Sequence, residues 1–373
     1  MRWCCSTRHP SPEPSTSRMP ASPPATLDPT RFAGQVNDRP TALYQLRNGR
    51  GMSVAVSNLG AKVLQIIVPD RHGEPGDVAL GYDNLASVIA GSPSMGAFIG
   101  RFAGRIAQAR FTMDGVEHLL PANGGAHCVH GGPGGSRHQV FNAEQADERS
   151  LHLHHRFSPD TDGFPGTLDL HLTYRVDDDH TLVIEHEAVA VEGTSVASFA
   201  PHGYFNLEGP GHTTIDEHVL SVNADAVLEA DDDNVVTGAR VSLDGHSLDL
   251  RQPRLLGTGE IGNGPLVIDH AYMVSGPTSG ERLCAVVSAA RSGRTLEVWS
   301  TEPVLQVYTA DALGRGTQPD HGKSGVAHRP RAGLCLEPQQ FPNAPNCPGL
   351  PLNTVAPGRP FTGRTRYRFG LMV

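Results

Sequence analysis

The feature that most constrains the fold is a succession of short runs in which apolar and polar residues alternate, with no long amphipathic helix between them. Residues 151–157, 167–176 and 181–191 alternate in this way, and polar or acidic turns separate them. A period of two residues is typical of a strand with one buried face. Without helices to cover a parallel sheet, this pattern favours an all-β fold, a large antiparallel β-sandwich.

Turn-forming residues divide the remainder of the chain into further short segments. Asp70 to Gly73 reads as a hairpin turn, and Asp114-Gly115 between two apolar runs is a strong hairpin signal. One short helix is expected over residues 83–90. The other expected strands cover residues 42–46, 52–57, 62–68, 77–80, 105–113, 116–120, 217–229, 241–250, 265–274, 283–290, 295–300, 304–309 and 362–373.

The first residues of the chain differ in composition from the rest. Residues 1–36 are rich in proline and serine, a composition that buries little apolar surface, so we expect a disordered N-terminal tail there. We also expect that Met19 is the true start of the protein. Residues 37–373 are long enough, in a chain with 38% hydrophobic residues, to form a single catalytic β-sandwich domain.

Charge and cysteine usage exclude several classes of partner. The 30 Lys and Arg residues are outnumbered by 39 Asp and Glu, and no basic run could neutralise a line of phosphates, so nucleic acid is not an expected partner. No stretch has the roughly 20 apolar residues of a membrane span, and no export signal is visible, which favours the cytoplasm. Six cysteines without CxxC spacing predict reduced thiols.

Two residues far apart in the sequence are candidates for acid–base chemistry. His202 follows a run of small residues and precedes an aromatic turn, and imidazole with an ordinary pKa near 6.5 exchanges protons readily at neutral pH. Glu337 ends an apolar run, Leu334-Cys335-Leu336, and is followed by Pro338. A single His or Glu in such a chain is more often structural, so the surrounding motifs must decide.

The glycine-rich segment 123–135 has three possible functions. A phosphate-binding loop needs a strand before it, a helix after it and usually a lysine, and that combination is not evident. A metal site built from His127, Cys128 and His130 lacks the spacing that metal ligands use. We prefer a loop whose glycines let the backbone approach a small molecule, with His130 in the same cleft as His202.

Five motifs in a consistent order resemble those of the aldose 1-epimerases, or galactose mutarotases. Ile99 to Ile106 (IGRFAGRI) resembles the family's GRxANRI, and Val129 to Gly132 resembles LHGG. The stretch PHGYFNLEG resembles NHxYFNLxG, IDH resembles xDHxF, and LCLEPQQFPNAPN resembles LxLExQxxPDAxN. The resemblance covers residue 40 to the end of the chain.

The resemblance implies a galactose mutarotase-like β-sandwich that holds a sugar in an open cleft. It makes His202 the general acid and Glu337 the general base, and it implies that four residues bind the sugar: Arg105, His130, Asp269 and Gln306. Three positions depart from the family motifs: Gly104 and Pro201 each replace an Asn, and Asn343 replaces an Asp.

The implied activity is interconversion of the α and β anomers of free aldohexoses such as galactose and glucose. Glu337 would remove the O1 proton while a charged His202 protonates O5, which opens the ring so that it can close on the other face. We expect both groups to be charged before the sugar binds. No cofactor or metal is expected, and the unit is expected to be a monomer or homodimer.

Two alternatives share the fold. The first is epimerisation of a hexose 6-phosphate, which needs extra arginines at the cleft, and Arg137 is the evident addition. The second is a non-catalytic sugar-binding protein, although that alternative conflicts with the presence of both His202 and Glu337.

Overall fold

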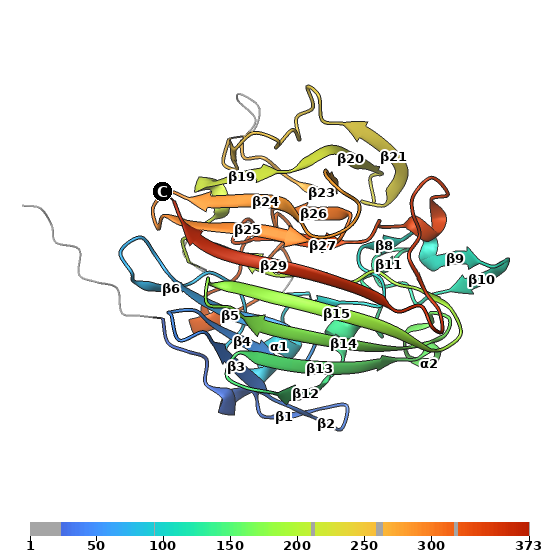
Figure 1. Cartoon of the computed structure of the whole chain (residues 1–373), viewed down its shortest axis with the longest axis horizontal. Coiled ribbons are helices and arrows are strands. Elements are labelled where there is room, and N and C mark those ends of the chain that lie inside the picture. The colour runs from blue at the N-terminus through green and yellow to red at the C-terminus, as the bar shows by residue number, and fades with distance from the viewer. Residues whose placement is uncertain (1–23, 93, 210–212, 259–263, 317–319, 373) are drawn as a thin grey trace, which may run out of the picture.

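The computed structural model describes residues 24–92, 94–209, 213–258, 264–316 and 320–372, and three antiparallel sheets dominate it (Figure 1). The largest has nine strands that form one long face of the molecule. In spatial order they are β12 (Asn142–Gln145), β13 (Ser150–Phe157), β14 (Thr167–Val176), β15 (Thr181–Glu192), β29 (Phe361–Leu371), β25 (Arg294–Ser300), β24 (Arg282–Ala289), β19 (His218–Val222) and β22 (Arg254–Leu255).

A six-stranded and a four-stranded sheet complete the main architecture. The six-stranded sheet has the order β18 (Tyr204–Phe205), β27 (Leu334–Gln339), β26 (Val304–Tyr308), β23 (Asp269–Val274), β20 (Ala224–Ala230) and β21 (Val236–Ser242). The four-stranded sheet consists of β3 (Leu43–Arg47), β4 (Ser53–Ser57), β5 (Lys62–Pro69) and β6 (Pro75–Asp77).

Short ladders and single helical turns connect these sheets. The ladders are β1 (Gly34–Val36) with β2 (Arg39–Thr41), β7 (Phe98–Ile99) with β17 (Ala200–Pro201), β8 (Arg105–Ile106) with β11 (Cys128–Val129), β9 (Arg110–Met113) with β10 (Val116–Leu119), and β16 (Ser195–Val196) with β28 (Thr354–Val355). The helices are α1 (Leu85–Ala90), α2 (Pro159–Asp162), η1 (Pro29–Phe32), η2 (Ala107–Ala109), η3 (Ser136–His138), η4 (Ile215–Glu217), η5 (Lys323–Gly325) and η6 (Ala344–Asn346). No helix in the described part of the chain has the length and apolar character that crossing a membrane requires.

The main hydrophobic core lies between the nine-stranded sheet and the two smaller sheets. Alternate residues of β14, among them Leu170 and Leu172, are buried and belong to one cluster with Val54 of β4 and Leu336 of β27. Burial of one face only explains the alternation along β14. The sequence-based prediction of an antiparallel β-sandwich is therefore confirmed.

Strand β27 differs from β14 because both of its faces are buried. Leu334 and Leu336 point into the core, so the alternation of side chains directs Cys335, Glu337 and Gln339 to the opposite face of the six-stranded sheet. Glu337 and Gln339 line a cleft on that face. A carboxylate is thereby placed on a strand of the sheet rather than on a loop.

Most predicted strands are present, but four predictions are wrong in part. The strand expected over residues 105–113 is divided into β8 and β9 by η2, where Gln108 has a φ of +51°, and the strand expected over residues 265–274 begins only at Asp269. Residues 77–80 form only the end of β6, because the Asp77 carboxylate accepts the backbone N–H groups of Ile66 and Ala79 in place of a regular ladder. Residues 243–250 are turns rather than strand, since Gly245 has a φ of +71° and His246 donates its N–H to the Leu243 carbonyl. Strand β21 precedes these turns.

The predicted tail needs a correction at its C-terminal end. Residues 1–23 lie outside the described residues, but residues 24–36 contain η1 and β1. Phe32 is fully buried and Leu27 nearly so, in a second core cluster with Leu64 of β5. Two apolar residues among the prolines are enough to attach this segment to the sandwich, so a disordered tail does not extend to residue 36.

Candidate active site

A cleft of about 350 Å³ opens on the face of the six-stranded sheet that points away from the core. All six residues that the sequence predicts for the site line it: Arg105, His130, His202, Asp269, Gln306 and Glu337. They come from β8, the loop after β11, the connection between β17 and β18, and strands β23, β26 and β27. Segments that are distant in the sequence thus form one cavity.

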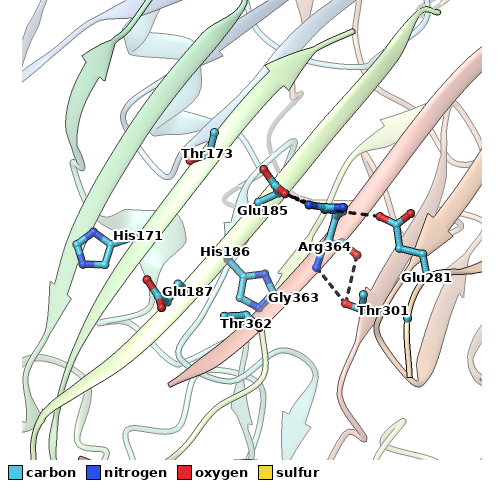
Figure 2. Close-up of a pocket in the computed structure, with 11 residues that line it drawn as sticks. His171, Thr173, Glu185, His186, Glu187, Glu281, Thr301, Thr362, Gly363 and Arg364 are labelled. Carbon is cyan, nitrogen blue, oxygen red and sulfur yellow. Dashed lines mark hydrogen bonds and ion pairs between the residues drawn. The ribbon is translucent and has the colours of Figure 1, made fainter. Parts of the chain in front are cut away.

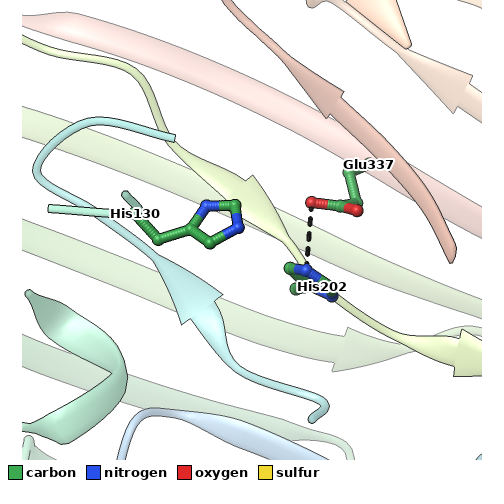
Figure 3. A group of neighbouring side chains, drawn as sticks. All are labelled: His130, His202 and Glu337. Atoms are coloured by element: carbon green, nitrogen blue, oxygen red, sulfur yellow. Dashed lines mark ion pairs between the residues drawn. The ribbon is translucent and has the colours of Figure 1, made fainter. Parts of the chain in front are cut away.

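His202 and Glu337 face each other across this cleft (Figure 3). The His202 backbone is held at both sides, because its N–H donates to the Ala97 carbonyl at 2.8 Å and its carbonyl accepts the Gly96 N–H at 3.0 Å. Its imidazole Nε2 lies 3.5 Å from Oε2 of Glu337. The two groups are near enough to exchange a proton after a small approach or through one bound hydroxyl.

Burial controls the charges of this pair. The exposed fractions are 5% for His202 and 2% for Glu337. Burial lowers the pKa of His202 to about 3, while burial and then the nearby Asp269 carboxylate raise the pKa of Glu337 well above its ordinary value. Burial thus contradicts the expected positive charge on His202 and opposes the expected negative charge on Glu337.

His130 contributes a second imidazole, whose ring packs edge-to-face on that of His202 at a centroid distance of 5.3 Å. Nδ1 of His130 accepts the Gly104 N–H at 3.2 Å. In the neutral ring, the proton is therefore on Nε2, where it can be donated to a ligand. Burial, followed by the neighbouring His202, lowers the pKa of His130 well below its ordinary value, which favours this neutral donor.

Asp269 and Gln306 form a hydrogen-bonded pair at the floor of the cleft. The Gln306 amide Nε2 donates to the Asp269 carboxylate at 2.7 Å, from the neighbouring strand. Burial raises the pKa of Asp269, and the positive charge of Arg105 opposes this shift. Arg105 also lowers the pKa of Glu337. The Arg105 guanidinium thus opposes the upward pKa shifts of Asp269 and Glu337, and it would favour the ionised form of both carboxyl groups.

The glycine-rich loop carries His130 into the cleft, as predicted, but its glycines act differently from the expectation. Gly131 has a φ of +77°, and a Cβ there would lie 2.4 Å from the Gly100 carbonyl oxygen. The glycine therefore allows this loop to pack against the backbone of residues 100–101 rather than against a ligand. His127 bonds elsewhere, since its Nδ1 accepts the Gln108 N–H.

Three groups of the site also have the chemistry of metal ligands. The donor atoms of His130, His202 and Glu337 lie within 4.8 Å of one another. Two imidazoles and a carboxylate are a known donor set for Zn²⁺. The sequence prediction considered His127, Cys128 and His130 instead, and Cys128 is buried in an apolar cluster with Phe102 and Ile106.

The three departures from the family motifs have separate structural settings. Gly104 lines the cleft, so the missing side chain leaves space there. Pro201 points away from the cleft into the apolar interior beside Leu182 and Ile184. Asn343 donates to the Val236 carbonyl at 2.8 Å, which an aspartate could not do. Of the three, only Gly104 lies where it can affect sugar contacts.

Sequence reasoning missed several residues of the cleft. Tyr308 and Gln339 line it together with Ser94, whose hydroxyl accepts from the buried Arg137 guanidinium at 2.9 Å. A usable signal was present: Tyr308 and Gln339 each lie two residues after a predicted site residue on the same strand, and positions two apart share a face.

A larger groove of about 660 Å³ lies on the outer face of the nine-stranded sheet, away from this cleft (Figure 2). Figure 2 shows Arg364 between Glu185 and Glu281, and it forms ion pairs with both. Arg366 also pairs with Glu281, so arginines balance the charges of both glutamates. The smaller cleft, with its buried acid and base, is the better candidate for catalysis.

Known proteins are similar to this chain over most of its length. A family model described as aldose 1-epimerase matches residues 42–368. A galactose mutarotase from Mus musculus is 36% identical over 329 residues, covering 88% of this chain and 94% of the relative. An aldose 1-epimerase from Escherichia coli (strain K12) is 30% identical over 342 residues, covering 89% and 96% respectively.

Solved structures show the same fold. A GalM/aldose epimerase homologue from C. elegans has a TM-score of 0.83 at 26% identity, covering 89% of this chain and 100% of that one. A galactose 1-epimerase from Lactobacillus acidophilus has a TM-score of 0.76 at 22% identity, covering 91% and 97%. With the sandwich, the cleft and these matches over most of its length, the chain belongs to the aldose 1-epimerase family.

Proposed function

We propose that this isomerase interconverts the α and β anomers of free aldohexoses such as galactose and glucose, with His202 and Glu337 transferring the protons. The observation that carries the proposal is the 3.5 Å distance between Nε2 of His202 and Oε2 of Glu337. Both side chains are buried, and both line a cleft that a monosaccharide can enter. The names of the relatives support the substrate class.

The reaction needs one proton removed and one supplied. Glu337 takes the proton of the anomeric hydroxyl O1 while His202 gives a proton to the ring oxygen O5, and the C1–O5 bond breaks to leave the open-chain aldehyde. The aldehyde turns about the C1–C2 bond. Reversal of both transfers on the other face of the carbonyl gives the opposite anomer.

The pair carries one proton before the sugar binds and the same number during catalysis. Moving that proton from the Glu337 carboxyl to the His202 imidazole converts the neutral pair into the carboxylate and imidazolium that the reaction needs. Sugar hydroxyls in the cleft, together with the Arg105 guanidinium, would stabilise the charged form. Substrate binding would thus activate the pair.

The other cleft residues would bind the sugar. Asp269 and Gln306 would accept from and donate to ring hydroxyls, since they form one polar surface. His130 would donate through Nε2 to an oxygen that gains negative charge during ring opening. None of these steps requires a cofactor, because the reaction involves no net oxidation.

The test is polarimetry of freshly dissolved α-D-glucose and α-D-galactose in a weakly catalysing buffer. Wild-type protein should accelerate the change in rotation, and Glu337→Gln should abolish most of that acceleration. Glu302→Gln is the matched control, because Glu302 is equally buried but does not line the cleft. No acceleration by folded wild type would contradict the proposal.

A hexose 6-phosphate is a second candidate substrate because of Arg137. Its guanidinium lines the cleft and is 7% exposed, and no carboxylate within the described ranges lies within ion-pair distance of it. Two of its bonds go to neutral acceptors, the Ser94 hydroxyl and the Val129 carbonyl. Polarimetry with glucose 6-phosphate tests this candidate directly.

We further propose that the protein acts in the cytoplasm as a monomer or homodimer. Cys128, Cys284, Cys335 and Cys347 are buried free thiols, which fits a reducing compartment. Light scattering coupled to size-exclusion chromatography would determine the oligomeric state, and fractionation of cells would test the compartment.

A further inference from the structure

Gln339 is a buried amide without a partner in the protein. Its side chain is 1% exposed, and neither its Oε1 nor its Nε2 forms a hydrogen bond with any described residue. Buried amides in folded proteins almost always have partners, because an unsatisfied amide loses its bonds to water and gains none in return. The unsatisfied amide of Gln339 therefore suggests that a ligand supplies its hydrogen bonds.

The position of Gln339 connects it to the proposed reaction. It lies two residues after Glu337 on β27, so the two side chains leave the same face of the strand with Cα atoms about 6.7 Å apart. Both line the cleft. Glu337 and Gln339 both pair with β26, opposite Gln306 and Val304, so the same neighbouring strand supports the two residues.

The protein around Gln339 offers it little to bond. Val304 is its partner across the sheet, and Met273 lies beside Val304 on the next strand. Pro342, which has no N–H, also lines this part of the cleft. These neighbours are apolar, so the missing hydrogen bonds follow from the composition of the site.

Two other polar side chains of the cleft, Gln306 and Tyr308, differ from Gln339 in this respect. Gln306 donates to Asp269 at 2.7 Å, and the Tyr308 hydroxyl accepts the Ala312 N–H at 3.0 Å. Their orientations are fixed before a ligand arrives. The Gln339 carboxamide retains a free donor and a free acceptor.

We propose that Gln339 binds a ring hydroxyl of the sugar and is a further specificity-determining residue of the site. The hydroxyl would donate to Oε1 and accept from Nε2, and these bonds replace those that the amide lacks in the free protein. This inference rests on the proposed function, in which Glu337 acts at O1 of the same sugar. A sugar without that hydroxyl would leave the amide unsatisfied again.

The test compares Gln339→Met with wild type and with the control Gln340→Met. Methionine has nearly the volume of glutamine but makes no comparable hydrogen bonds. Gln340, the next residue, instead donates to the Glu302 carboxylate at 2.6 Å, and it does not line the cleft. The measurements are kcat and KM for glucose and its 2-, 3-, 4- and 6-deoxy derivatives, and Tm.

For Gln339→Met we expect kcat/KM on glucose to fall by about 10- to 100-fold, mainly through a higher KM, with Tm equal to or above that of wild type. One deoxyglucose should be converted equally well by wild type and variant, which identifies the hydroxyl. Gln340→Met should lower Tm and leave KM unchanged. If Gln339 had only a structural role, Gln339→Met would lower Tm, and its effect on kcat/KM would be the same for every sugar.

Each remaining outcome overturns the inference. Unchanged kcat/KM on every sugar, or loss of folding in Gln339→Met, would show that Gln339 does not act on substrate. If Gln339→Met lowers kcat/KM by the same factor for glucose and for every deoxy sugar, Gln339 contacts no single hydroxyl. Inactive wild type would refute the proposed function and this inference with it, whereas active wild type with an unaffected variant refutes this inference alone.

Discussion

The Nε2 atom of His202 lies 3.5 Å from Oε2 of Glu337, and both side chains are almost completely removed from solvent. In water the two groups would be an imidazole with a pKa near 6.5 and an ionised carboxylate. In the cleft, desolvation opposes both charges: it lowers the pKa of His202 and raises that of Glu337. The pH dependence of activity follows from this arrangement.

The kcat/KM profile of wild type should be bell-shaped and broad. Its acid limb arises when the pair gains a second proton as pH falls toward the lowered pKa of His202, about 3. Its alkaline limb arises when the pair loses its single proton as pH rises through the raised pKa of Glu337, above the ordinary 4.5. Rates measured from pH ~2 to ~10, with folding checked at each pH, test both limbs.

Within that profile, Glu337→Gln and His202→Asn should each lower turnover by about 10²- to 10⁴-fold, the usual contribution of a general acid or base. Circular dichroism and Tm serve as controls for folding. An alkaline limb at or below pH 4.5, or near-normal turnover in either variant, would contradict the assignment of this pair.

Arg105 should set the position of the alkaline limb. Its positive charge lowers the pKa values of Glu337 and Asp269, so Arg105→Met removes a group that opposes their upward shift. The alkaline limb of kcat/KM should therefore move to higher pH, and the maximum should fall because a sugar-binding group is lost. Arg364→Met, on the outer face of the nine-stranded sheet, is the control and should not move the limb. A limb that moves to lower pH would contradict this account.

Glu302 should reduce stability above neutral pH. Burial raises its pKa to about 7, with Gln340 donating to it and His186 3.9 Å away. The folded protein therefore binds this proton more tightly than the unfolded chain between pH 4.5 and 7, and the free energy of unfolding falls as pH rises through that range.

Glu302→Gln removes that dependence. Relative to wild type, the variant should gain free energy of unfolding between pH 4.5 and 7, by an amount on the order of 3 kcal/mol for a shift of this size. Urea denaturation at pH ~5 and ~8 measures the difference. A stability difference that is the same at both pH values would show that Glu302 titrates normally.

Removal of one partner of the buried pair Arg101 and Asp162 should be among the most destabilising single substitutions. Both side chains are fully buried, Nε of Arg101 donates to the carboxylate at 2.9 Å, and Nη1 donates to two backbone carbonyls. Asp162→Asn would leave the guanidinium charge buried without its counterion, at a cost of about 3–5 kcal/mol.

A surface pair provides the comparison for Asp162→Asn. Glu117 pairs with Arg110, and both side chains are 55% exposed, so Glu117→Gln should cost less than about 1 kcal/mol. Chemical denaturation of both variants checks the contrast. Equal losses would mean that burial does not decide the strength of these pairs.

The sequence by itself determined the strands and the chemical groups of the site. Alternation along residues 167–176 matches β14 at both ends, because one face of that strand meets the core and the other meets solvent. The motifs around His202 and Glu337 identified the residues that line the cleft. Both kinds of information are local, so they can be read from neighbouring positions.

Only the tertiary structure decided the charges and partners of these groups. The shifts of His202 and Glu337 depend on burial by segments far away in the sequence, and desolvation is the largest cause of each shift. The same holds for Gln339, whose missing partners follow from the apolar residues that the sheet places beside it. Burial and distance arise from the packing of remote segments, and a pattern of neighbouring residues does not contain them.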